Sequence, residues 1–185
     1  QRRCAGLMGI HGPMLERGRE ATAESMHSLQ FALTGAGPVQ RLVGRPLAGG
    51  WGEGRLVGGS LSLVVASLGT PWEIDTRGAI LLLEERGEAP YRIDRMLQQL
   101  MAAGKFSEVV GVGIGATTDC EDERHPDFGV EVLLAEILAP LGVPVLSELP
   151  FGHGETNLAW PVGGRAAIDA DRGEIELLES AVAAR

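Results

Sequence analysis

Three short apolar runs alternate with two helix-like segments in the middle of the chain, and this alternation limits the folds that are open to it. The runs are "GAILLLEER" (78–86), "EVVGVGIG" (108–115) and "VPVLSEL" (143–149). Unbroken apolar runs of this length are typical of parallel strands that are buried on both faces. The segments between them, residues 89–104 and 127–142, repeat apolar residues at helical spacing. The pattern predicts a βαβαβ core in which a three-stranded parallel sheet carries both helices on one face.

Glycine-rich segments flank this core on both sides. Residues 38–60 contain short β-prone stretches broken by glycines, which predicts hairpins or a small antiparallel sheet that covers the second face. Residues 165–179 predict two more strands around the turn "DADRGE". Helices are expected within residues 11–35, ending at Gly35, and over residues 60–69. The pattern as a whole indicates one α/β domain with a small parallel sheet, flanking helices and a second, antiparallel layer.

Charge and composition argue against some classes of partner. The formal net charge of −9 argues against binding to a nucleic-acid backbone, which requires a basic face. No apolar run approaches the length of a membrane span, so no membrane partner is expected. Only two cysteines, Cys4 and Cys120, are present, which argues against a disulfide framework and predicts a cytoplasmic location. The chain starts with Gln1 rather than methionine, and we expect its true beginning to lie upstream.

One histidine and one glutamate are predicted to meet at the rim of the sheet. Side chains that follow the carboxyl ends of parallel strands collect at one edge of an open α/β sheet, where function usually lies. Glu84 lies near the end of the first apolar run, and His153 follows the third in the stretch "PFGHGETN". A carboxylate on one ring nitrogen fixes the tautomer, and the other nitrogen can then take a proton from a nucleophile. Near its reference pKa of about 6.5, such a histidine works in both directions at neutral pH.

Each of these two residues also has an ordinary structural interpretation. A histidine between glycines is often only a turn residue. A glutamate at a strand end often caps the next helix or pairs with an arginine. The nearby rivals and possible partners of Glu84 are Glu85, Arg86, Glu88, Arg92 and Arg95. The residues alone leave both interpretations open.

The nucleophile is the part of a catalytic site that this sequence does not supply. No G-x-S-x-G turn is present. Ser60 and Ser62 in "GGSLS" precede a predicted helix and are expected to cap its first turn. Cys120 lies in an acidic loop, whose charges raise the pKa of a thiol, and we interpret it as a buried bystander.

Two further motifs are not assigned a function. "GVGIGATTD" (111–119) follows a strand, but it lacks the third glycine of a dinucleotide fingerprint and leads into an acidic loop. "DCEDERH" contains four possible metal ligands, and a solvated acidic loop explains it better than a metal site. These ligands are Asp119, Cys120, Glu121 and His125. We therefore expect neither a cofactor nor a metal.

Several segments, taken in order, resemble the C-terminal part of the serine LD-carboxypeptidases, also called muramoyltetrapeptide carboxypeptidases. The most specific are "LPFGHG" (149–154) and "EAPYRIDRML" (88–97). The others are "HGPML" (11–15), "LVGGSLSLVVASLGTPWE" (56–73), "ILLLEERGEAPYRIDRMLQQL" (80–100) and "GVGIGATTDC" (111–120). The resemblance covers nearly the whole chain.

The resemblance implies a fold and a catalytic site. It implies a C-terminal domain of the swivelling β/β/α type over residues 36–185. Residues 1–35 would then be the tail of a truncated flavodoxin-like domain and a connecting helix. By position, the glutamate and histidine of the family's Ser-Glu-His triad fall on Glu84 and His153. The family's serine lies on a G-[YF]-S-D-like turn shortly before "HGPM", so we expect it upstream of Gln1.

The implied reaction is hydrolysis of the L,D amide of murein tetrapeptides in cytoplasmic cell-wall recycling. The resemblance also implies a homodimer that uses no metal, and the 185-residue chain alone is expected to be inactive. Two positions depart from the family pattern, because Ser60 replaces a usual asparagine and Glu85 a frequent aspartate. Neither departure affects His153.

Two other functions remain open. A microcin-immunity peptidase shares the triad but cleaves aminoacyl or peptidyl nucleotides, and it needs an aromatic side chain that stacks on the nucleobase. Trp51 and Trp160 are available for that contact. The second alternative is a non-catalytic binding or assembly module, which is favoured if the reading frame truly begins near Gln1.

Overall fold

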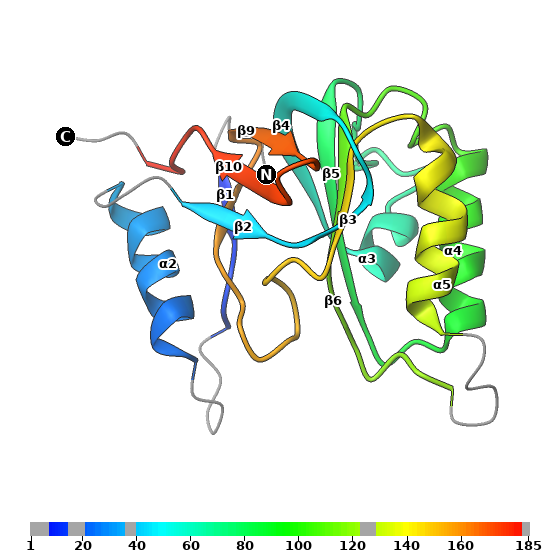
Figure 1. The fold of residues 1–185 in the computed structure, drawn as a ribbon, viewed down its shortest axis with the longest axis horizontal. Coiled ribbons are helices and arrows are strands. Elements are labelled where there is room, and N and C mark those ends of the chain that lie inside the picture. Colours follow the sequence, from blue (N-terminus) through cyan, green and yellow to red (C-terminus); the bar gives the residue numbers. More distant parts are fainter. Residues whose placement is uncertain (1–7, 15–20, 36–39, 123–128, 183–185) are drawn as a thin grey trace.

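The structure, a computed structural model, describes residues 8–14, 21–35, 40–122 and 129–182. Figure 1 shows a large sheet with three helices on one side and helix α2 (Ala23–Thr34) on the other. The large sheet has eight strands in the order β2-β10-β9-β4-β5-β6-β7-β3, and β1 pairs with β8 in a separate two-stranded sheet. The strands are β1 (Gly9–His11), β2 (Arg41–Val43), β3 (Arg45–Ala48), β4 (Trp51–Ser60), β5 (Ala79–Arg86), β6 (Gly111–Thr118), β7 (Val145–Ser147), β8 (Trp160–Val162), β9 (Arg165–Asp169) and β10 (Glu174–Leu177).

Four parallel strands, β4 to β7, form the centre of the large sheet. The three predicted apolar runs become β5, β6 and β7, and β5 is buried on both faces. Leu81 and Leu83 pack into one apolar cluster, while Ile80 and Leu82 pack into the other. The fourth parallel strand, β4, was not predicted, because its glycines interrupt any apolar run. The prediction of three parallel strands is therefore wrong by one, whereas the α/β class with an antiparallel layer is confirmed.

Three helices cover one face of the parallel strands, as predicted for the two crossover helices. They are α3 (Leu61–Ala66), α4 (Pro90–Ala102) and α5 (Val130–Leu138), and the short 3-10 helix η1 (Ala139–Leu141) continues α5 toward β7. Pro90 occupies the first turn of α4, where its missing N–H costs no hydrogen bond. The helix then buries Ile93, Leu97 and Leu100 against the sheet. This layer is a conventional apolar core.

The large sheet curls until its two edges meet. β2 and β3 are separated by Gly44 alone, yet they stand at opposite ends of the strand order. β2 pairs with β10 and β3 pairs with β7, both antiparallel. The amide of Gly44 also donates a hydrogen bond to the carbonyl of Gly173, at 2.9 Å. The predicted hairpins within residues 38–60 are therefore wrong, because β2 and β3 pair with β10 and β7, and β4 pairs with β5 and β9.

The second face is covered by strands, and α2 lies on the same side, where it contacts the loop before β8. β9 and β10 form the hairpin predicted from the tail. They approach β6 closely, because a Cβ atom on Gly111 would lie 2.6 Å from Cγ2 of Ile168. α2 begins after Thr22 and ends at Gly35 in the left-handed conformation, as predicted for that glycine. Within the described parts of the chain, no helix has the length and apolar character to cross a membrane.

Candidate active site

Glu84 and His153 lie in contact at the end of strand β5. The Oε2 atom of Glu84 is 2.7 Å from Nδ1 of His153. The Glu84 side chain is only 2% exposed, whereas the His153 side chain is 38% exposed. The structure therefore brings together the two residues that sequence analysis selected, with a buried carboxylate behind a partly exposed ring.

The backbone before His153 is shaped by its closeness to Glu84. Gly152 has a φ of +97°, a conformation that L side chains rarely adopt. A Cβ atom at this position would lie 2.8 Å from both Cβ and Oε2 of Glu84. Glycine at position 152 thus lets the loop descend onto the end of β5, and this approach brings His153 within reach of the carboxylate.

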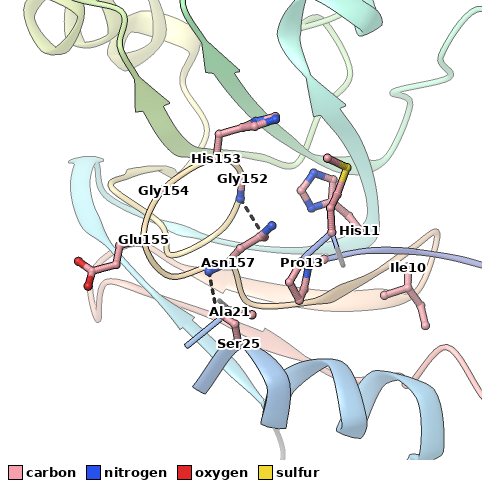
Figure 2. Close-up of a pocket in the computed structure, with 12 residues that line it drawn as sticks. Ile10, His11, Pro13, Ala21, Ser25, Gly152, His153, Gly154, Glu155 and Asn157 are labelled. Carbon is pink, nitrogen blue, oxygen red and sulfur yellow. Dashed lines mark hydrogen bonds between the residues drawn. The ribbon is translucent and has the colours of Figure 1, made fainter. Parts of the chain in front are cut away.

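A pocket of about 270 Å³ opens beside this pair. Its wall is formed by the end of β1 with the turn after it, by the start of α2, and by the loop that carries His153. Figure 2 shows Asn157 between Gly152 and Ser25, with a hydrogen bond to each. The lining residues are Ile10, His11, Gly12, Pro13, Met14, Ala21, Ser25, Gly152, His153, Gly154, Glu155 and Asn157.

His11 is a second histidine of this pocket, and sequence analysis did not single it out. Its ring stacks on Trp160, with 5.0 Å between centroids, and meets Phe151 edge-on at 5.9 Å. Its Nδ1 atom is buried and has no hydrogen-bond partner among the described residues. Burial lowers the pKa of His11; the Glu84 carboxylate opposes this shift, and His153 adds to it. The only available signal was its place in the family-like segment "HGPML".

The two structural roles considered for Glu84, capping of a helix and pairing with an arginine, are filled by Glu85 and Glu88 instead. Glu85 accepts hydrogen bonds from the amides of Ser62 and Arg86, at 2.8 and 2.9 Å, and so caps the start of α3. Glu88 pairs with Arg92 one helical turn away, at 3.0 Å. Consecutive glutamates thus have different tasks, because side chains of a strand alternate between the two faces.

The two serines of "GGSLS" do not cap α3 as predicted. Ser60 occupies the N-cap position, but its side chain makes no capping hydrogen bond. The hydroxyls of Ser60 and Ser62 lie 2.9 Å from each other instead. The carboxylate of Glu85 caps the helix in their place.

Cys120 is buried, as expected of a bystander thiol. Burial is the main cause that raises its pKa, and the charges of Glu85 and Asp119 raise it further. Within the described residues, no group of three or more histidine, cysteine or acidic side chains is arranged to hold a metal. Cys4, and His125 of the "DCEDERH" motif, lie outside the described residues.

Comparison with known proteins adds independent information. The family model "LD-carboxypeptidase C-terminal domain" matches residues 53–168. A putative carboxypeptidase from Synechocystis is 38% identical over 175 residues, which cover 94% of this chain and 58% of that protein. The crystal structure of muramoyltetrapeptide carboxypeptidase from Oxalobacter formigenes superposes with a TM-score of 0.80 at 30% identity, over 93% of this chain and 60% of that one.

A more distant relative carries a different name. The microcin C7 self-immunity protein of Escherichia coli is 28% identical over 130 residues, which cover 69% of this chain and 37% of that protein. The chain thus spans a little over half the length of the carboxypeptidases that it matches. On the family match and the identity to the Synechocystis protein, this chain belongs to the LD-carboxypeptidase family and contains its C-terminal domain.

Proposed function

We propose that this chain supplies the oriented base of a serine-type LD-carboxypeptidase that removes the terminal D-residue of murein tetrapeptides. The observation that carries the proposal is the 2.7 Å contact between Glu84 Oε2 and His153 Nδ1 at the edge of a pocket. A buried carboxylate behind a partly exposed imidazole is the arrangement of an acid–base pair in hydrolases. Similarity to a muramoyltetrapeptide carboxypeptidase supports the substrate class.

The proposed chemistry follows from the hydrogen bond to Nδ1. In the proposed tautomer Nδ1–H of His153 donates a hydrogen bond to Oε2 of Glu84, which leaves the lone pair of the ring on Nε2. His153 then takes the proton of a serine hydroxyl as the oxygen attacks the L,D amide carbonyl, and it returns that proton to the departing amine of D-alanine. A water molecule, activated by the same ring, hydrolyses the acyl-enzyme.

We propose that the nucleophilic serine lies outside the described residues. Ser25 lines the pocket, but it is only 1% exposed and its hydroxyl contacts Thr22 and the amide of Asn157. Ser60 and Ser62 contact each other. The chain covers only 58% and 60% of the two carboxypeptidases compared above, so those proteins contain a large part that is not matched here.

The test is release of D-alanine from an L,D-tetrapeptide by the full-length protein. We expect His153→Ala to lower kcat by about 10³-fold or more with little change in melting temperature. His27→Ala is the matched control, because His27 is an exposed histidine of α2 outside the pocket. Retention of activity in His153→Ala would contradict the proposal, as would turnover by the 185-residue chain that disappears in Ser60→Ala or Ser62→Ala.

Neither of the two tryptophans considered for a nucleobase contact lies at the pocket, which supports a peptide over a nucleotide conjugate as substrate. Trp160 is fully buried against His11, so it offers no free face to a nucleobase. Trp51 is 62% exposed, but it starts β4 whereas Ser60, beside Glu84, ends it. A strand of that length separates the two ends by about 30 Å. The microcin-immunity alternative predicts that the full-length protein cleaves an aminoacyl nucleotide faster than the tetrapeptide. We expect instead that it cleaves the tetrapeptide faster.

The proposal extends to the organisation of the protein. Residues 36–185 would form the C-terminal domain, which contains the matched segment, and residues 1–35 would end the flavodoxin-like domain and connect the two. We further propose a cytoplasmic homodimer, on the family resemblance. Cell fractionation tests the location, and light scattering with size-exclusion chromatography tests the dimer.

A further inference from the structure

The loop that carries His153 needs support from outside itself. It connects β7, which ends at Ser147, to β8, which begins at Trp160, and it contains no helix or strand. A catalytic base works only if its ring is held to within about 0.5 Å of the productive position. The contact with Glu84 fixes one nitrogen of the ring, so the backbone on either side must be fixed by other groups.

Asn157 ties the two ends of this loop together. Its Oδ1 atom accepts a hydrogen bond from the amide of Gly152, at 3.0 Å. This bond closes a ring of residues that contains His153. Gly152 is also the residue whose backbone lies against Glu84. The side chain of Asn157 therefore holds the backbone immediately before the histidine.

Ser25 anchors Asn157 to helix α2. The amide of Asn157 donates to Oγ of Ser25 at 3.0 Å. That oxygen lies 2.8 Å from Oγ1 of Thr22, which caps α2 and also accepts from the amide of Ser25 at 3.1 Å. Because Ser25 is only 1% exposed, the cap fixes its hydroxyl and water does not compete for it. A buried serine on the inner face of a helix is unusual, and here it has a specific partner.

We propose that Ser25 and Asn157 are positioning residues for His153. The chain of contacts runs from the N-cap of α2 through Ser25 and Asn157 to Gly152, and from there to the ring that contacts Glu84. Backbone hydrogen bonds from Ala116 to Phe151 and from Leu158 to Pro150 hold the chain just before Gly152, at 2.9 and 2.7 Å. Loss of either side-chain partner removes the additional restraint on the amide of Gly152 and so loosens the ring on the carboxylate. The catalytic consequence of this inference rests on the proposed function, whereas the effect on the ring does not.

The same helix offers a matched control. Ser28 lies one turn after Ser25, is 5% exposed and accepts a hydrogen bond from the amide of Ala159 at 2.9 Å. Its hydroxyl also donates to the carbonyl of Ser25, at 2.8 Å, so both serines make one contact within α2 and one with the loop. Ser28 differs from Ser25 because its partner in the loop, Ala159, lies after Asn157, and because Ser28 does not line the pocket. Ser28→Ala therefore removes a bond of the same kind between the same helix and the same segment, beyond the ring that contains His153.

The experiment compares kcat and KM in the full-length protein. We expect Ser25→Ala and Asn157→Ala to lower kcat by 10- to 100-fold while KM changes less than threefold, because the base is displaced and the substrate contacts remain. Ser28→Ala should stay within threefold of the wild type in both constants. Asn157→Asp retains the acceptor for Gly152 and should recover most of kcat, with the acidic limb of the pH profile moved upward by the added negative charge.

A second measurement separates this inference from the proposed function. Nitrogen-15 NMR of the histidine rings reports whether His153 keeps its proton on Nδ1, without any need for substrate. We expect Ser25→Ala and Asn157→Ala to mix the tautomers of His153, and Ser28→Ala to leave them unchanged. If the wild type does not cleave the tetrapeptide, the proposed function fails. The NMR signal of the His153 ring still tests whether Ser25 and Asn157 position that ring. Equal effects of Ser25→Ala and Ser28→Ala on kcat and on the ring would overturn this inference.

Discussion

The helices on the two sides of the sheet differ in the residues that they bury. α4 buries Ile93, Leu97 and Leu100 against one face, together with other apolar residues. The buried residues of α2 on the other side are Ser25, Ser28 and Ala32. Contacts on the first side are apolar, whereas those on the second include hydrogen bonds between buried hydroxyls and the backbone of the loop that carries His153.

This difference separates a stabilising layer from a positioning layer. Apolar contacts are non-directional, so the α3–α5 side tolerates substitutions that preserve volume. Buried hydrogen bonds are directional and specify one arrangement of the groups that make them. We therefore expect substitutions on the first side to change stability more than activity, and substitutions around the pocket to change activity more than stability.

Glu84→Gln gives the largest expected effect and tests the pocket side. An amide cannot stabilise the imidazolium that forms when His153 takes a proton, so we expect kcat to fall by about 10³- to 10⁴-fold. The volume is conserved, and the melting temperature should change by only a few degrees. Steady-state kinetics of the full-length protein and a thermal melt measure both quantities. A fall of less than tenfold would remove Glu84 from the catalytic pair.

Leu97→Ala tests the helical side. Leu97 is fully buried in α4, and the cavity left by its truncation should lower the free energy of unfolding by about 2–5 kcal/mol. Chemical denaturation measures this change. The kcat of the folded fraction should remain within twofold of the wild type, and a large loss of kcat would show that the two sides are not separate.

Glu85→Ala sharpens the contrast between consecutive acids. It removes the cap on the amide of Ser62 and should cost about 1–2 kcal/mol of stability. We expect kcat to change by less than tenfold, in contrast to Glu84→Gln. If Glu85→Ala were as inactive as Glu84→Gln, the assignment of separate tasks to the two carboxylates would be wrong.

His11→Phe has the smallest expected effect, on the pH dependence of stability. The pKa of His11 is lowered in the folded protein, so the unfolded chain binds more protons, and stability is lost as pH falls below about 6.5. Phenylalanine keeps the stacking on Trp160 but does not titrate. Denaturation between pH 7.5 and pH 5 should therefore show a shallower loss of stability in the variant, and an unchanged slope would contradict the assignment of this loss to His11.

Much of the fold was accessible from the sequence because its signals are local. The apolar runs of β5, β6 and β7 and the helical spacing of α4 lie in continuous segments, and each was predicted. The segment of β4 was predicted to be short antiparallel strands rather than one parallel strand, because its glycines replace the apolar residues of a buried strand. The pairing of β2 and β3 could not be predicted, because their partners, β10 and β7, lie far along the chain.

The same distinction applies to the site. Glu84 lies near the end of one predicted strand and His153 follows another, so their meeting could be expected from topology. Asn157 and Ser25 are 132 residues apart, and nothing in either local sequence indicates the other. His11 depends on a stacked partner, Trp160, from the opposite end of the chain. Contacts of this kind become visible only when the chain is folded.

The connection of β2 to β3 through Gly44 alone has a consequence for folding during synthesis. β2 and β3 leave the ribosome early, but β7 is synthesised 100 residues after β3, and β10 is synthesised 133 residues after β2. Pairings between such distant segments slow folding, because the intervening chain must be ordered first. The nascent chain therefore carries two unpaired strands until β7 and β10 emerge, and we expect closure at Gly44 to be among the last steps after translation.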